Sequence, residues 1–172
     1  MGLLPEIERR TSVRHYTTEP LDPAALDRIL DAGRRAPSAK NRQSWRFLVL
    51  TDHDLRIKIQ DACFGQEYVG QAPAVIALCT TNIEYKMPNG QLSYPVDLSI
   101  AASFMMLQAV HEGLGSCLVT TFREDDVKSL LTVPYSMRVV MMLTVGHAAA
   151  DGVPVDPSPR LPAERVISFN HW

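Results

Sequence analysis

Residues 96–115 read VDLSIAASFMMLQAVHEGLG and predict the helix around which the fold is organised. From Leu98 to Val110 the stretch is apolar on nearly every side, so a single buried stripe does not explain it. Asp97 is placed to open this helix, and Gly113 or Gly115 to close it. Such a helix is buried all round, either in the core of one subunit or partly against a second subunit. The pattern does not choose between the two.

Short aliphatic runs flank this helix along the chain. They are RFLVLT at 46–51, AVIALCT at 74–80 and RVVMMLTV at 138–145. Short runs that are rich in β-branched and aliphatic residues and do not alternate with polar ones are typical of strands buried on both faces. We therefore expect three central strands.

Two further helices are predicted from their start signals. At 22–36, Asp22 can cap a helix and Pro23 fits its first position. Asp125 and Asp126, just before VKSLL, favour another helix N-terminus. The residues that form the apolar stripe of the first of these helices are Leu26, Ile29, Leu30 and Gly33.

Composition limits the class of protein. With 172 residues and 46% hydrophobic content, the chain predicts one globular domain with a substantial core. Its formal net charge of -2 offers no cationic surface for nucleic acid or for a membrane. Cys63, Cys79 and Cys117 form no metal-ligand spacing with the histidines, and the N-terminal residues lack a signal-peptide stretch, so we expect a cytoplasmic protein.

The last part of the chain, 148–172, reads as an extended arm. Four prolines in ten residues after Gly152 oppose regular structure, and RVISF at 165–169 then offers a last short strand. The arm could cross its own subunit or a neighbouring one.

A first polar motif lies near the N-terminus. In an extended segment, Arg10, Ser12 and Arg14 fall on one side because strand side chains alternate. Two guanidinium groups and a hydroxyl suit a phosphomonoester. The alternative is a solvated basic turn beside Glu6 and Glu8.

A second polar motif is APSAKNRQSW at 36–45, where a helix ends before Pro37 and a loop carries Ser38, Asn41 and Gln43. Hydroxyls and carboxamides both donate and accept, which suits the ribityl chain and pyrimidine edge of a flavin. The alternative is a turn whose polar groups satisfy their own backbone.

Taken together, R-x-S-x-R and A-P-S-x-x-N-x-Q-x-W resemble the nitroreductase family. The likeness continues through GLGSC at 113–117, VGH at 145–147 and RLPAERVISFNHW at 160–172, so it covers nearly the whole chain. The resemblance implies an α+β fold, a three-layer α/β/α sandwich with a mainly antiparallel sheet. It also implies a homodimer with exchanged C-terminal arms that holds FMN at its interface.

The resemblance implies a role for each motif residue. Arg10, the Thr11 backbone and Ser12 would hold the FMN phosphate. Arg14 would face the N1 and O2 edge of the flavin, where a cation stabilises the reduced ring. The remaining FMN contacts implied are Pro37, Ser38, Ala39, Asn41 and Gln43 from the other subunit, Thr120 and Thr121 at N5 and O4, and Arg160 at the phosphate.

The chain also departs from the family pattern. Many relatives have Pro at Ser44, an aromatic residue followed by Gly within 118–121, and a second basic residue at Ser158. The segment 80–95 is short compared with relatives that place a lid there, which implies an open flavin face. Tyr85, Lys86 and Tyr94 could neighbour a substrate, although exposed loop residues are the more common case.

The activity implied is electron transfer from NAD(P)H to a small acceptor such as a nitroaromatic, quinone or enone, by a ping-pong mechanism. No side chain need be catalytic, because the flavin performs the hydride step. Two alternatives stay open: a dehalogenase-like or flavin-modifying enzyme, and an FMN-binding storage or regulatory protein without turnover.

Overall fold

Four antiparallel strands form one sheet in the order β1-β2-β4-β3. The computed structural model describes residues 2–150 and 160–172. The strands are β1 (Trp45–Leu50), β2 (Ala74–Thr80), β3 (Gly115–Val119) and β4 (Arg138–Gly146). β2 and β4 occupy the centre and are buried along nearly their whole length, so the two central strands expected at 74–80 and 138–145 are confirmed.

β1 differs from the expectation of a strand buried on both faces. It is an edge strand, in which Trp45 and Leu50 are buried while Arg46, Leu48 and Val49 are exposed. Residue type alone does not distinguish an outer aliphatic strand from a central one. Within the described residues, the outer edge of β1 pairs with no strand.

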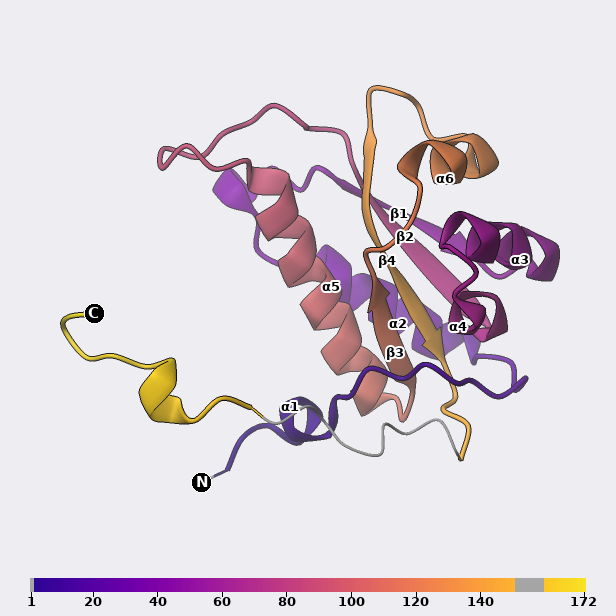
Figure 1. Ribbon diagram of the computed structural model, residues 1–172, viewed down its shortest axis with the longest axis horizontal. Coiled ribbons are helices and arrows are strands. Elements are labelled where there is room, and N and C mark those ends of the chain that lie inside the picture. The colour runs from indigo at the N-terminus through magenta and orange to yellow at the C-terminus, as the bar shows by residue number, and fades with distance from the viewer. Residues whose placement is uncertain (1, 151–159) are drawn as a thin grey trace.

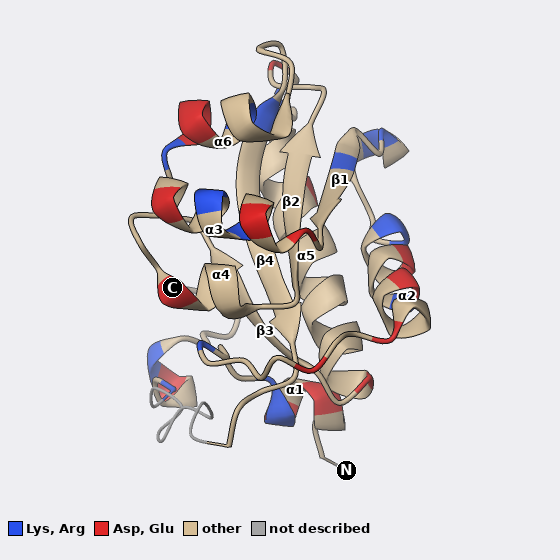
Figure 2. Ribbon diagram, turned by 90° about the vertical axis from the view of Figure 1, so that its right-hand side faces the viewer, with Lys and Arg blue, Asp and Glu red and all other residues tan. Residues whose placement is uncertain are grey.

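Helices cover both faces of the sheet and give three layers (Figures 1 and 2). One layer holds α2 (Pro23–Arg34) and α5 (Ser93–His111); the other holds α3 (His53–Ala62), α4 (Glu67–Gln71) and α6 (Glu124–Leu131). The remaining short elements are α1 (Pro5–Arg9), η1 (Ala39–Asn41) and η2 (Ala163–Arg165). The fold is therefore an α+β sandwich with an antiparallel sheet, and α6 begins where the acidic pair predicted a helix.

The hydrophobic core has two halves, because successive strand residues face opposite layers. Ile76 and Leu143 pack on the side of α2 and α5, and Val75 and Met142 on the side of α3, α4 and α6. None of the described helices has the length and apolar character needed to cross a membrane.

The central helix α5 corrects two expectations. It begins at Ser93, so Asp97 lies inside the helix, where it is 3% exposed and does not cap the N-terminus. The helix is also not buried on every side, since Val96 is 41% and Phe104 is 40% exposed. The core therefore covers only part of α5, and Val96 and Phe104 form an exposed apolar stripe on it.

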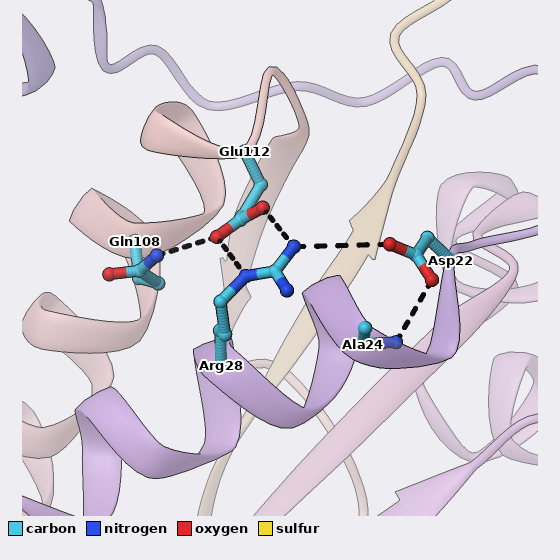
Figure 3. Close-up of polar contacts among 5 residues, drawn as sticks. All are labelled: Asp22, Ala24, Arg28, Gln108 and Glu112. Atoms are coloured by element: carbon cyan, nitrogen blue, oxygen red, sulfur yellow. Dashed lines mark hydrogen bonds and ion pairs between the residues drawn. The ribbon is translucent and has the colours of Figure 1, made fainter.

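The helix predicted at 22–36 is confirmed, and polar contacts fix it to α5 (Figure 3). Asp22 caps the helix by accepting from the Ala24 amide at 3.0 Å. Arg28 binds Glu112 through two hydrogen bonds, Nε to Oε1 at 2.8 Å and Nη2 to Oε2 at 2.7 Å, and Gln108 donates to the same carboxylate. The Arg28 guanidinium lowers the pKa of Glu112 to about 2.

The expected strand at 165–169 is wrong for the single chain. η2 ends at Arg165, and the residues that follow form no strand. Residues 160–172 are all exposed, and their backbone hydrogen bonds to other described residues stay within the segment. The arm expected at 148–172 is described only in part, because Ser158 and three of its four prolines, Pro154, Pro157 and Pro159, lie outside the described residues.

Candidate functional site

The first motif lies on an extended segment that crosses the ends of β3 and β4 (Figure 1). The Val13 amide donates to Ser116 O at 3.0 Å, and the Thr17 amide to His147 O at 2.9 Å. Val13 faces the core with 5% exposure, whereas Arg14 on the next position is exposed. The backbone is therefore extended, as the alternation of the motif predicts.

Gly115 allows this segment to approach the sheet. A Cβ at Gly115 would lie 2.6 Å from Val13 Cγ2 and 2.8 Å from Val13 Cβ. The Tyr16 hydroxyl donates to Val13 O at 2.9 Å and lies 2.8 Å from Thr144 Oγ1. The motif is thus held by packing as well as by hydrogen bonds.

The two arginines of the first motif flank Ser12, which pairs with Ser116 at the start of β3. Burial raises the pKa of the Cys117 thiol, and the positive charges of Arg14 and Arg10 oppose that rise. Two cations at one edge of the sheet are the groups that a phosphate and a negatively charged reduced ring require.

Gln66, between α3 and α4, joins these helices to the segment after β3. Its Nε2 donates to Cys63 O at 2.8 Å and to Thr121 O at 2.9 Å, and its Oε1 accepts from the Tyr68 hydroxyl at 2.6 Å. Burial raises the pKa of Tyr68 to about 12, so this hydroxyl keeps its proton at neutral pH. These hydrogen bonds, which we call the Gln66 clamp, hold the peptide that follows Thr121 in place.

The donors of this edge fit a flavin. Thr120 and Thr121 are exposed, and within the described residues their amides make no backbone hydrogen bond outside the strand ladder. Ser116 Oγ, on the strand beside Ser12, is buried without a partner among those residues. The Ser116 hydroxyl and the exposed backbone at Thr120 and Thr121 thus lie along the strand that the first motif joins, and such groups suit a phosphorylated polar ring.

The second motif forms the short turn η1 and satisfies several of its own polar groups. Ser38 Oγ accepts from the Gln43 amide at 3.0 Å, and Gln43 Nε2 donates to Asn41 Oδ1 at 3.0 Å. Lys40, Asn41 and Gln43 have positive φ angles of 52°, 54° and 50°, a conformation that residues other than Gly rarely adopt. Asp97 Oδ1 accepts from the Ala39 amide at 2.8 Å and holds the turn in place.

The two motifs lie at opposite corners of the sheet in one chain. Ser12 pairs with Ser116 at the start of β3, where Gly115 faces Gly146. The second motif precedes Trp45, which pairs with Thr80 at the other end and on the other edge of the sheet. The two motifs of one chain therefore do not share a corner of the sheet.

The remaining sequence candidates occupy different surroundings. Tyr85 is half-buried under the second motif, with the Arg42 guanidinium carbon 4.0 Å from its ring centroid. Tyr94 is also half-buried, so Lys86 is the only one of these three residues that is exposed. Arg160 is exposed and meets neither motif.

Sequence reasoning missed Gln66 and Tyr68 and misread the role of Asp97. A carboxylate inside an apolar helix was the available signal for Asp97; Gln66 and Tyr68 gave none. No group of three or more His, Cys, Asp or Glu side chains that could bind a metal occurs in the parts of the chain that the structure describes.

The chain is similar to known proteins over most of its length. The model of the family described as "Nitroreductase family" matches residues 7–87 and 64–147. An NADH dehydrogenase of Thermus thermophilus is 27% identical, over 92% of this chain and 91% of its own. An iodotyrosine deiodinase of Thermotoga neapolitana is 25% identical, over 93% of this chain and 92% of its own.

Solved structures agree with these matches. An FMN-dependent nitroreductase from Clostridium difficile superposes with a TM-score of 0.84 at 25% identity, over 97% of this chain and 98% of its own. The family model spans both polar motifs and the whole sheet, and the fold matches as well. The chain therefore belongs to the nitroreductase family.

Proposed function

We propose that this protein is a homodimeric FMN-dependent oxidoreductase that passes electrons from NAD(P)H to a small acceptor. The separation of the two motifs carries the proposal, because neither corner of the sheet offers a complete flavin site. FMN held there would supply the redox chemistry, with NAD(P)H as hydride donor and a small molecule as electron acceptor in separate half-reactions.

Each subunit contributes two sets of contacts. Arg10, the Thr11 backbone and Ser12 would bind the FMN phosphate, and Arg14 would stabilise negative charge at N1 and O2. The amides of Thr120 and Thr121 would face N5 and O4. The contacts from the other subunit are Pro37, Ser38, Ala39, Asn41 and Gln43.

The C-terminal arm supports a dimer. The side chains of the arm are unusually open to solvent for apolar residues of a monomeric protein. The exposed fraction is 61% for Val166, 53% for Ile167 and 85% for Phe169. The open edge of β1 offers a place where an arm from the second subunit could add a strand. The resemblance to the family is what places Arg160 at the FMN phosphate in this proposal.

A complementation experiment tests the shared site. Arg10→Ala and Asn41→Ala homodimers should each bind FMN poorly, since every site lacks one contact. Subunits mixed at random form half heterodimers with one intact site each, so about a quarter of the wild-type sites should return. FMN titration followed by anaerobic NADH or NADPH bleaching measures this, and a mixture no better than its parents would refute the shared site.

The similarity to an iodotyrosine deiodinase favours one alternative, reductive removal of halogen from an aromatic substrate. Halide release from an iodophenol under anaerobic NAD(P)H would favour it over nitroaromatic or quinone reduction. A storage or regulatory flavoprotein would bind FMN yet show no repeated NAD(P)H oxidation with any acceptor.

A further inference from the structure

Asp97 is a buried carboxylate inside the long helix α5. Its neighbours Leu98 and Ala101 belong to the hydrophobic core, and Asp97 itself is only 3% exposed. Oδ1 accepts from the Ala39 amide at 2.8 Å, and Oδ2 is buried without a partner among the described residues. A buried carboxylate is costly unless hydrogen bonds offset its lost hydration. The stability of the subunit alone therefore does not explain an acid at this position.

The polar turn at 38–43 depends on Asp97 for its attachment. Bonds within the turn, such as the one from the Asn41 amide to Ser38 O at 2.8 Å, give it its shape but do not fix it to the subunit. In the part of the chain that the structure describes, the bond from Ala39 to Asp97 is the only hydrogen bond that joins these residues to another element.

The backbone of this turn needs such an attachment. Lys40, Asn41 and Gln43 have φ angles of 52°, 54° and 50°, in the left-handed region that side chains other than Gly disfavour. A conformation of this kind persists where the surrounding structure fixes it. The bond to Asp97 holds the backbone at Ala39, one residue before the left-handed stretch begins.

Asp97 lies far from the first motif of its own chain. His111, at the other end of α5, meets Glu6 of α1 with Nδ1 and Oε1 3.0 Å apart (Figure 1). That end is about 21 Å along the helix axis from Asp97, at a rise of about 1.5 Å per residue. A change at Asp97 should therefore disturb the second motif of its subunit and leave the first motif in place.

We propose that Asp97 is a positioning residue that acts across the dimer. By binding the Ala39 amide, it sets the affinity of the FMN whose phosphate the other subunit holds. The inference rests on the proposed shared site and adds to it a buried residue that does not contact the flavin. Asp97 acts as a hydrogen-bond acceptor, so a neutral acceptor of the same shape can replace it.

Two substitutions separate the acceptor from the charge. Asp97→Leu has a similar size and no acceptor, and should weaken FMN binding about tenfold. Asp97→Asn keeps an acceptor oxygen and should weaken it by less than about threefold. Ser93→Ala is the matched control, because Ser93 is also buried on α5 but makes no bond to the second motif. Its FMN affinity should stay at the wild-type value.

Mixed dimers test on which side of the flavin site Asp97 acts. Asp97→Leu subunits mixed at random with Arg10→Ala subunits form half heterodimers, each with one intact site, so FMN titration should find about a quarter of the sites with wild-type affinity. Asp97→Leu mixed with Asn41→Ala should recover none, because both changes fall on the same side of every site. If Asp97 only kept its own subunit folded, neither mixture would recover.

The Ala39 amide provides a readout that needs no FMN. Its hydrogen exchange in the flavin-free dimer should be slow in the wild type, slightly faster in Asp97→Asn and fastest in Asp97→Leu. Asp97→Ala, which also lacks the acceptor and adds no bulk, takes the place of the Leu variant if that variant does not fold.

The mixtures also separate this inference from the shared site on which it rests. Recovery of Arg10→Ala by Asn41→Ala but not by Asp97→Leu would overturn the role of Asp97 alone. No recovery in either mixture would overturn the shared site and this inference with it. Equal loss of FMN affinity in the Asn and Leu variants would show that the acceptor is not what matters, and would overturn the inference as well.

Discussion

Gly115→Ala should weaken FMN binding through the position of the N-terminal segment. The new Cβ would lie 2.6 Å, 2.8 Å and 3.0 Å from Cγ2, Cβ and Cγ1 of Val13. A change of rotamer can move the two Cγ atoms, but the Cβ is fixed to the backbone. The strand or the segment must therefore shift, and the more weakly held partner is the segment that carries Arg10 and Arg14.

The size of the effect follows from packing and from the phosphate contacts. Overpacking of a buried site costs about 1–3 kcal/mol. Misplacing one charge-assisted hydrogen bond to phosphate costs about 1.5–3 kcal/mol, so FMN affinity should fall at least tenfold. Gly33→Ala is the matched control, because its added Cβ would meet the Met105 side chain, away from the first motif.

Urea unfolding and flavin fluorescence titration measure the two effects separately. We expect the Gly115→Ala midpoint to fall with an unchanged slope, and the dissociation constant for FMN to rise. Loss of stability with wild-type FMN affinity would refute the link between this strand and the flavin site. Unchanged stability would refute the close approach itself.

Three other changes test separate contacts. Gln66→Leu removes the hydrogen bond to Thr121 O, so amide exchange in the segment after β3 should accelerate about tenfold even without FMN. Unchanged exchange would show that Gln66 does not hold this segment in place. Glu112→Gln removes a carboxyl whose pKa Arg28 lowers to about 2, so the variant should be less stable by about 0.2–1 kcal/mol above pH 5. That difference should shrink as the pH falls from 4.5 towards 2, because the depressed pKa adds stability only while the wild-type carboxyl is ionised; a constant difference would contradict the assignment. Arg14→Ala should lower the potential of bound FMN by tens of millivolts, and an unchanged potential would remove Arg14 from N1 and O2.

The sequence predicts the secondary structure wherever the local pattern of residues determines it. Asp22 and Pro23 mark a helix start by chemistry that needs no tertiary context, and the buried β2 and β4 have continuous aliphatic runs. The sequence does not show that β1 lies at the edge of the sheet, because that depends on whether another strand pairs with its outer side. The tail at 165–169 shows the same limit, because a strand needs a partner that one chain does not supply.

The sequence predicts which residue types form the candidate site, but not how all of them are arranged. Arg10, Ser12 and Arg14 could be placed on one side of an extended segment by alternation alone. The clamp made by Gln66 could not, because it joins carbonyls that belong to Cys63 and Thr121, and no side-chain pattern encodes the direction of a backbone carbonyl.

The second motif is attached to α5, the helix that carries the exposed apolar stripe. Asp97 Oδ1 binds the Ala39 amide, so the motif is fixed to the same helix that leaves Val96 and Phe104 exposed. A subunit that packs on the stripe therefore meets Ser38 and its neighbours at a defined distance from the helix. Hydrophobic association and placement of the flavin contacts would then be one event, and a variant that separates the subunits should lose FMN even with every polar contact residue unchanged.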